Sequence, residues 1–128
     1  LDVIHAFLAQ ESYWSQGVPR SVVERAIANS LCFGVYHGDV QVGFARVVTD
    51  RSTFALLADV FVLKGHRGKG LSKWLVRCVV EHEDLQGLRR FLLATSDAHG
   101  LYRQFGFDAL GNPSRFMEVF RPDIYRSR

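Results

Sequence analysis

The chain has 128 residues, of which 48% are hydrophobic and 23% charged, a balance typical of a globular domain rather than of a disordered segment. We therefore expect a single domain over residues 1–128. Sixteen Lys and Arg against thirteen Asp and Glu give a net charge of +3. This excess is too small and too scattered to predict a nucleic-acid partner.

The five histidines and two cysteines have no spacing typical of a metal site or of a disulfide framework. No apolar run approaches the ~18 residues of a membrane span, and no basic and then apolar leader opens the chain. We therefore expect no bound metal and no membrane partner. Cysteines without a disulfide framework favour the reducing cytoplasm.

The N-terminal part has the pattern of two helices joined by a loop. Apolar residues recur at helical spacing over residues 1–11, and Trp14 lies in the loop that follows. Ser21 and Glu24 have the spacing of a capping box, which predicts that a second helix begins there and ends near Ser30.

Three strands separated by turns are predicted over Cys32–His37, Gln41–Thr49 and Phe54–Leu63. Strict alternation in the second strand would place Val42, Phe44 and Arg46 on one face of the sheet. The third strand is apolar almost throughout and is broken only by Asp59. Such a run predicts a central strand that is buried on both faces.

The rest of the chain has the pattern of a long helix, a strand, a short helix and a hairpin. The long helix is expected over about residues 71–83, with an apolar stripe of Leu71, Trp74, Leu75, Cys78, Val79 and His82. A strand over Arg89–Thr95 and a short helix that Gly106 ends come next. Phe107–Leu110 and Phe116–Phe120 are expected to pair as a hairpin. This order predicts a mixed α/β fold with parallel strands where helices intervene.

The turn between the third strand and the long helix is rich in glycine and positive charge. Gly68 and Gly70 would let the backbone approach a bulky anion, and Arg67 and Lys69 add positive charge. The first N–H groups of a helix have no partners within it, and the helix dipole makes that end electropositive. The combination predicts a pyrophosphate site. The simpler alternative is a basic turn before an ordinary helix.

Two other nucleotide-binding motifs fit this turn less well. A Walker loop requires Lys and then Ser or Thr after its last glycine, whereas Leu71 and Ser72 follow Gly70. A dinucleotide fingerprint requires a third glycine where this chain has Lys73. Neither motif matches.

The segment from Arg67 to Ser72 resembles the pyrophosphate motif of the GNAT superfamily of acyl-CoA N-acyltransferases. That motif has Arg or Gln, then Gly three residues later, then a small residue, here Ser72. A second segment resembles the family motif N-x-x-A-x-x-L-Y-x-x-x-G-F. It supplies Ala98, Leu101, Tyr102, Gly106 and Phe107, with Thr95 in place of the asparagine. The resemblance covers roughly Cys32 to Phe120.

The resemblance implies the acyl-CoA N-acyltransferase fold, in which a mixed sheet of about six to seven strands is flanked by about four helices. Two parallel central strands splay apart in that fold. The family usually begins with a strand before its first helix, and this chain begins at Leu1 without one. We therefore expect the native N-terminal strand to precede Leu1. A monomer or a homodimer is expected.

The resemblance also implies that acetyl-CoA binds as a co-substrate. A backbone N–H of Phe61 or Val62 would polarise the thioester carbonyl. The residues expected to bind acetyl-CoA are Phe61, Val62, Leu63, Arg67, Gly68, Lys69, Gly70, Leu71, Ser72, Thr95, Ala98 and Tyr102.

Two side chains are candidates for proton transfer. Tyr102 matches the family tyrosine, which implies that it donates a proton to the departing thiolate; packing in the core is the alternative. Asp59 is either a general base or a carboxylate that shapes the sheet through a bond to Arg46 or to the backbone.

The prediction is an N-acetyltransferase that moves an acetyl group from acetyl-CoA to a primary amine by direct attack in a ternary complex. For the acceptor, Tyr13, Trp14 and Tyr36 are candidate walls of an aromatic pocket, and Arg46 is a candidate ligand for a carboxylate or phosphate. The alternatives are a non-catalytic acyl-CoA-binding regulatory module and an enzyme that acetylates a lysine or the N-terminus of a partner protein. The sequence does not identify the acceptor amine.

Overall fold

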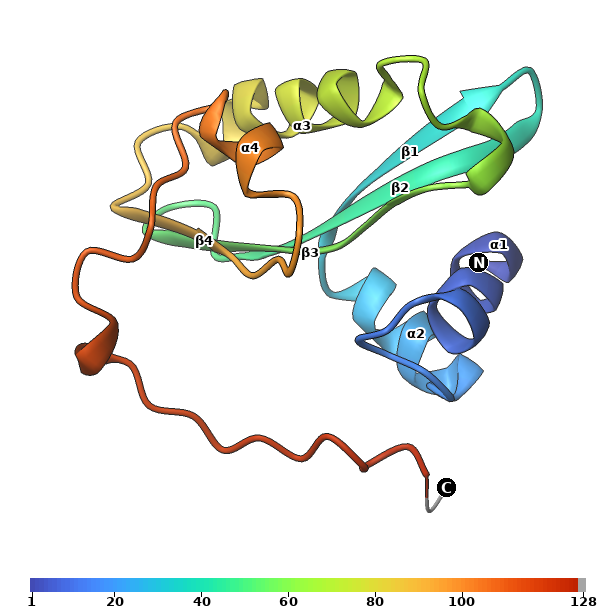
Figure 1. Ribbon diagram of the computed structural model, residues 1–128, viewed down its shortest axis with the longest axis horizontal. Helices are drawn as coiled ribbons and strands as arrows, with labels where there is room; N and C mark the ends of the chain where they lie inside the picture. The colour runs from blue at the N-terminus through green and yellow to red at the C-terminus, as the bar shows by residue number, and fades with distance from the viewer. Residues whose placement is uncertain (127–128) are drawn as a thin grey trace.

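The computed structural model describes residues 1–126, which form one sheet with helices on both of its faces (Figure 1). The helices are α1 (Asp2–Ala6), α2 (Arg20–Ala28), α3 (Leu71–Glu81) and α4 (His99–Arg103). The strands are β1 (Leu31–His37), β2 (Val40–Thr49), β3 (Phe54–Val62) and β4 (Arg90–Leu93). Helices α3 and α4 lie on one face, and α1 and α2 on the other. This is the predicted mixed α/β class.

The strand order is β1-β2-β3-β4. β2 pairs antiparallel with both β1 and β3, and β4 pairs parallel with β3. The apolar strand β3 is therefore central, as predicted, and the parallel pair is connected through α3. The described sheet has four strands, fewer than the six to seven expected.

Two apolar clusters hold the helices to the sheet. The cluster under α3 and α4 contains Val35, Val42, Ala45, Val47, Ala55, Leu57, Leu75, Val76, Val79, Leu85 and Tyr102. The cluster under α1 and α2 contains Ile4, Phe7, Leu8, Val18, Val23, Phe44 and Phe61. The sheet is thus buried on both faces, which accounts for the continuous apolar run of β3.

Between α4 and residue 126 the chain forms no hairpin, so the predicted strands Phe107–Leu110 and Phe116–Phe120 are wrong. Phe107 packs edge-on against Phe91, 5.2 Å between ring centroids, and the guanidinium of Arg90 lies 4.9 Å from the ring centroid of Phe116. Each of these two aromatic rings therefore packs against a different residue of β4, and the two predicted strands do not pair with each other.

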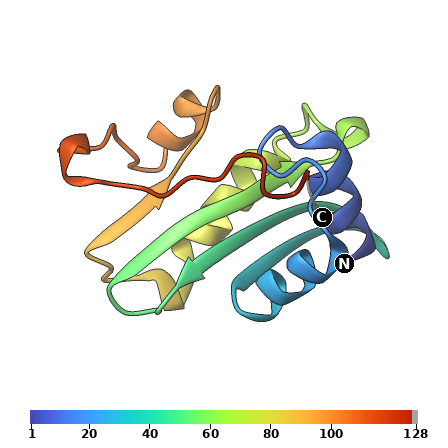
Figure 2. The same cartoon turned by 90° about the horizontal axis from the view of Figure 1, so that it is seen from below.

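Beyond those contacts the chain runs in extended form back towards α1 and α2 (Figure 2). A 3₁₀ turn at Pro113–Arg115 precedes Phe116, and near the end of the extended run Tyr125 packs against the cluster under α1 and α2. Met117, Val119 and Phe120 are exposed between these two anchors. Within residues 1–126, the segment thus runs from β4 to the helices α1 and α2 without pairing with a strand.

Both predicted N-terminal helices are present, but the predicted capping box is wrong. α1 continues as a π-helical turn over Phe7–Glu11, so the chain is helical to the predicted end. α2 begins at Arg20, and the carbonyl of Pro19 accepts the N–H of Val22. Because extended Pro19 is the N-cap, Ser21 already lies inside the first turn and makes no cap bond.

Val42 does not share a face with Phe44, contrary to the predicted alternation. The register of β1 on β2 shifts between Val35 and Tyr36, which leaves Val42 as the extra residue of a β-bulge. A bulge reverses the alternation of side chains beyond it. Val42 therefore packs under α3, whereas Phe44 packs under α1 and α2.

The apolar face of α3 is rotated from the predicted stripe. Leu75, Val76 and Val79 are buried, whereas Trp74 is 52% exposed and Cys78 is exposed. The helix crosses β1, β2 and β3, and small β-branched side chains fit closely against a pleated surface. The expectation that Trp74 and Cys78 are buried was wrong.

Cys32 and Cys78 are both free, and burial raises the pKa of the Cys32 thiol. Within residues 1–126, no three His, Cys, Asp or Glu side chains are grouped so that they could hold a metal ion. No helix in this part of the chain has the length and apolar character needed to cross a membrane.

Candidate active site

The parallel strands β3 and β4 pair over only part of the length of β3. The ladder runs from Phe54 and Arg90 to Leu57 and Leu93 and ends there. β3 continues to Val62, while the chain after Leu93 leads into α4. A cavity of about 560 Å³ occupies the space between the two segments. The structure thus contains the predicted splayed pair of parallel strands.

Three parts of the chain line this cavity: the middle of β3, the segment from β4 into α4, and the loop after α1. The lining residues are Tyr13, Trp14, Leu56–Val60, Leu93–Ala98 and Tyr102. Of the predicted site residues, the cavity brings together Tyr13, Trp14, Asp59, Thr95, Ala98 and Tyr102.

Tyr102 belongs both to the core and to the cavity lining. Its side chain is 8% exposed, and its ring packs edge-on against Phe107 with 5.9 Å between ring centroids. Burial raises the pKa of the phenol, and the nearby Tyr13 and Asp97 raise it further. The phenol is therefore protonated at neutral pH and has a proton to donate at the cavity wall.

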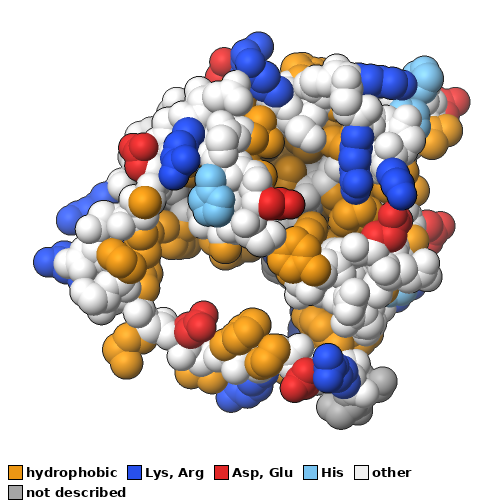
Figure 3. All heavy atoms as spheres, viewed as in Figure 1, with side chains coloured by type: hydrophobic (Ala, Val, Ile, Leu, Met, Phe, Trp, Pro, Cys, Tyr) orange, Lys and Arg blue, Asp and Glu red, His pale blue; other side chains and the backbone are white. Residues whose placement is uncertain are grey.

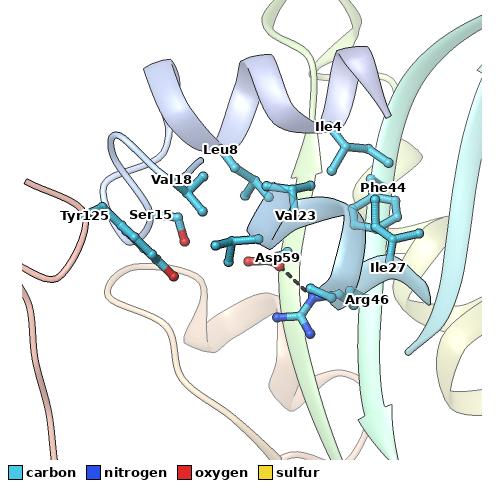
Figure 4. Close-up of a pocket in the computed structure, with 12 residues that line it drawn as sticks. Ile4, Leu8, Ser15, Val18, Val23, Ile27, Phe44, Arg46, Asp59 and Tyr125 are labelled. Atoms are coloured by element: carbon cyan, nitrogen blue, oxygen red, sulfur yellow. Dashed lines mark hydrogen bonds and ion pairs between the residues drawn. The ribbon is translucent and has the colours of Figure 1, made fainter. Parts of the chain in front are cut away.

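Asp59 lies at a β-bulge in β3. The register of β2 on β3 shifts there, and Asp59 has a φ of +52°, in the left-handed region that side-chain-bearing residues rarely adopt. Its carboxylate accepts a hydrogen bond from Trp14 Nε1 at 2.8 Å. It accepts a second from Arg46 Nε at 2.7 Å (Figure 4). The bond to Arg46 is one of the two contacts considered for Asp59 as a carboxylate that shapes the sheet, the other being a bond to the backbone. Asp59 thus holds the Trp14 ring at the cavity.

Asp59→Asn is expected to lower the free energy of unfolding by about 1–3 kcal/mol, as measured by urea denaturation. Asn tolerates the left-handed backbone, so the change isolates the loss of the negative charge opposite Arg46, whose side chain is only 19% exposed. Asp39→Asn, in the exposed turn between β1 and β2, is the matched control. Equal stability of the two variants would contradict a structural role of the ion pair.

The turn before α3 has the geometry of an anion site. Gly70 is the N-cap of α3 with a φ of +78°, Gly68 has a φ of +80°, and no side chain of residues 1–126 caps the helix. The first hydrogen bond of the helix joins the Trp74 N–H to the Gly70 carbonyl at 3.0 Å, so the preceding N–H groups have no helical partner. A Cβ added at either glycine would meet no heavy atom within 4 Å. The space beside the glycines is therefore open.

Positive charge surrounds the same turn. The basic side chains are Lys64, His66, Arg67, Lys69 and Lys73. Figure 3 shows Lys and Arg side chains gathered at the end of the molecule where α3 begins. The Nε of Arg67 donates to the Val62 carbonyl at 2.9 Å, which ties the turn to the end of β3. Open backbone N–H groups, glycine and positive charge together fit a pyrophosphate.

The three predicted backbone positions at the end of β3 do not face the same way. The Leu63 N–H donates to the Val42 carbonyl of β2 at 2.7 Å. Successive residues of a strand direct their backbone N–H and C=O groups to opposite sides. The backbone groups of Phe61 therefore also point to β2, and those of Val62 point away from it. The bond from Arg67 to the Val62 carbonyl agrees with this direction. Val62 therefore has the backbone N–H that points to the β4 side.

Two predicted acceptor-site residues lie outside the cavity. Tyr36 is 60% exposed on β1, at the opposite edge of the sheet from β4. Arg46 borders a smaller cavity of about 70 Å³ under α1 and α2, where Tyr125 also lies (Figure 4). Its Nη1 donates to Ser30 Oγ at 3.1 Å, and its Nε to Asp59. Arg46 thus reaches the large cavity only through Asp59.

Ser96 and Asp97 line the cavity but were not predicted as site residues. The Ser96 hydroxyl donates to the Tyr13 hydroxyl at 3.0 Å and so joins the loop after α1 to the segment before α4. Both residues lie between Thr95 and Ala98, at positions where the family motif accepts any residue. Their place within the motif was the only signal that could have found them.

The sequence and the structure are both similar to known acetyltransferases. A family profile described as acetyltransferase (GNAT) domain matches residues 28–109. A provisionally named acetyltransferase of Gibberella zeae is 33% identical over 124 residues, which cover 80% of this chain and 69% of that protein. A provisionally named GNAT acetyltransferase of Xanthomonas campestris has a crystal structure with 52% identity and a TM-score of 0.95, covering 97% of this chain and 87% of that one.

More distant structures share the fold. A GNAT acetyltransferase of Elizabethkingia anophelis, solved with acetyl-CoA bound, has 10% identity and a TM-score of 0.59, and the match covers 80% of this chain and 74% of that one. Together with the family profile, these matches confirm the resemblance predicted from the two motifs. The splayed strands and the turn before α3 belong to an acetyltransferase fold. The chain is a member of the GNAT acetyltransferase family.

Proposed function

We propose that this protein transfers the acetyl group of acetyl-CoA to a primary amine by direct attack in a ternary complex. The observation that carries the proposal is the position of the large cavity, which opens where β4 leaves β3 and contains the phenol of Tyr102. The uncapped start of α3 follows the end of the same strand β3. A thioester in the cavity and a pyrophosphate at α3 would therefore be held along one continuous stretch of chain.

Different groups of the chain would bind the pyrophosphate and polarise the thioester. The first N–H groups of α3, with Gly68 and Gly70, would hold the pyrophosphate, and the Val62 N–H would donate to the thioester carbonyl oxygen. One such donor contributes about 3 kcal/mol in a transition state. These assignments are supported by the open space at the glycines and by the direction of the Val62 backbone.

The chemical step needs no covalent intermediate with the protein. The amine nitrogen attacks the carbonyl carbon, the carbon–sulfur bond breaks, and the sulfur takes the proton of the Tyr102 hydroxyl. The nitrogen gives up one proton, which restores the phenol, so the products are the N-acetylated amine and free CoA thiol. Neither Cys32 nor Cys78 is among the described residues that line the cavity, in keeping with direct attack.

Acetyl-CoA is expected to raise the melting temperature, whereas ATP and NAD are not. A ligand at 100 times its dissociation constant stabilises a protein by about 2.7 kcal/mol. The measurement is a thermal melt with each compound at equal concentration, followed by an assay of CoA thiol release with simple primary amines. A shift with ATP or NAD and none with acetyl-CoA would overturn the proposal.

A further inference from the structure

Four of the exposed residues in the cavity lining lie in two segments, Tyr13 and Trp14 in the loop after α1 and Ser96 and Asp97 before α4, and we call this group the acceptor mouth. The Tyr13–Ser96 hydrogen bond joins the two segments. The rings of Tyr13 and Trp14 meet edge to face with 5.0 Å between centroids, and the two residues are 64% and 40% exposed. The mouth thus presents two accessible aromatic rings beside a carboxylate.

The charge of the cavity is negative. Asp59 and Asp97 are the charged side chains among its described lining residues, and no Lys, Arg or His accompanies them there. The charge of Asp59 is balanced by Arg46 at 2.7 Å, whereas none of the ion pairs within residues 1–126 includes Asp97. One uncompensated carboxylate therefore remains at the mouth.

We propose that the acceptor is an aliphatic amine that carries a second positive charge, and that Asp97 with the rings of Tyr13 and Trp14 recognises this second charge. The inference rests on the proposed function and names the substrate class of the same site. A cation is attracted both by a carboxylate and by the faces of aromatic rings, so the mouth combines two independent means of binding it.

The opposite charges of the two substrate sites favour this choice. The turn before α3 has five basic side chains and suits an anionic donor, whereas the cavity has only acidic ones. A cationic acceptor is attracted to the cavity and repelled by the turn before α3, so the two substrates would not compete.

An anionic acceptor held by Arg46 is the alternative, and the contacts of Arg46 disfavour it. Its Nε is bonded to Asp59 and its Nη1 to Ser30, and its side chain is only 19% exposed. The cavity that it borders has a volume of about 70 Å³, which is too small for an amino acid.

A bound cation would also act on the proposed acid. The negative charge of Asp97 contributes to the raised pKa of Tyr102. A second ammonium group beside Asp97 would offset that charge and make the phenol a better proton donor. The substrate's charge would therefore favour both its binding and the protonation of the leaving sulfur.

The test compares three acceptors that share one reacting amine: 1,4-diaminobutane, 4-aminobutan-1-ol and 4-aminobutanoate, whose far ends are cationic, neutral and anionic. Binding is measured by calorimetry on protein saturated with CoA, and kcat/KM by thiol release with acetyl-CoA. At low salt, both the affinity and the kcat/KM for the diamine are expected to be about threefold to fivefold higher than for the amino alcohol. Added salt should reduce this ratio.

Asp97→Asn should bring the ratio of the affinities for diamine and amino alcohol, and the ratio of their kcat/KM values, close to one. Asp39→Asn, which removes an equal charge far from the mouth, should preserve both ratios. An unchanged ratio in Asp97→Asn, equal binding of the three compounds, or binding of none would overturn the inference. A preference for 4-aminobutanoate would do the same and would point to Arg46. The proposed function fails separately, if acetyl-CoA itself does not bind.

Discussion

Tyr102→Phe is expected to lower kcat for acetyl transfer about a hundredfold or more, with little change in the affinity for acetyl-CoA. The buried phenol lines the cavity and stays protonated because burial raises its pKa. Phe keeps the ring contact with Phe107 and removes only the hydroxyl. The measurement is kcat by thiol release, alongside the dissociation constant of acetyl-CoA by calorimetry.

The pH dependence of kcat provides a check on this role. A proton donor must be protonated, so activity that depends on Tyr102 is lost as pH rises through its pKa. Because that pKa is raised above its ordinary value near 10, Tyr102 should cause no fall in kcat below about pH 10. Unchanged kcat in Tyr102→Phe would limit this residue to core packing, the alternative considered from the sequence.

Gly70→Ala is expected to weaken acetyl-CoA binding about tenfold or more, as measured by calorimetry. A Cβ at this position meets no protein atom within 4 Å and instead enters the space that a pyrophosphate would need. The left-handed backbone, with a φ of +78°, adds about 1–2 kcal/mol of strain to the substituted protein.

Gly87→Ala is the matched control for this experiment. Gly87 also has a left-handed φ, +72°, and open space around a built Cβ, but it lies between α3 and β4, away from the turn before α3. Both variants should lose similar stability to urea, and only Gly70→Ala should lose acetyl-CoA affinity. Equal affinity in the two variants would remove the turn before α3 from the proposed donor site.

Local patterns were enough to predict the elements that position the site. The apolar run of β3, the glycines before α3 and the helix that Gly106 ends are each determined by neighbouring residues, and the structure contains all three. The order of these elements predicted the parallel pairing of β3 with β4. The family motifs then predicted the fold around them.

Features that depend on long-range packing were not predictable in this way. Val42 and Asp59 lie at bulges that alter the alternation of side chains, and a bulge has no distinct signature in an apolar strand. The aromatic residues of the C-terminal segment suggested strands, but each finds a separate partner outside any ladder. The rotation of α3 depended on which side chains fit the sheet beneath it.

The candidate site also has one part that local sequence patterns predicted and one part that depends on long-range packing. The backbone of its proposed donor side is contiguous, from the end of β3 to the start of α3, and a motif describes it well. Its acceptor side joins Tyr13 to Ser96 and Trp14 to Asp59 across large separations in the chain. Such pairs depend on the fold as a whole, so the sequence suggested the residues Trp14 and Asp59 but not the bond between them.

The two tryptophans of the chain lie at different parts of the proposed site, Trp14 in the cavity lining and Trp74 in α3 beside the proposed pyrophosphate site. The indole N–H of Trp14 is bonded to Asp59 at the cavity, whereas Trp74 is half exposed in the first turn of α3. If the proposed donor and acceptor sites are correct, the protein therefore contains an optical probe for each substrate. In variants that keep a single tryptophan, fluorescence would follow the arrival of donor and acceptor separately, and the order in which they bind could be observed without any label.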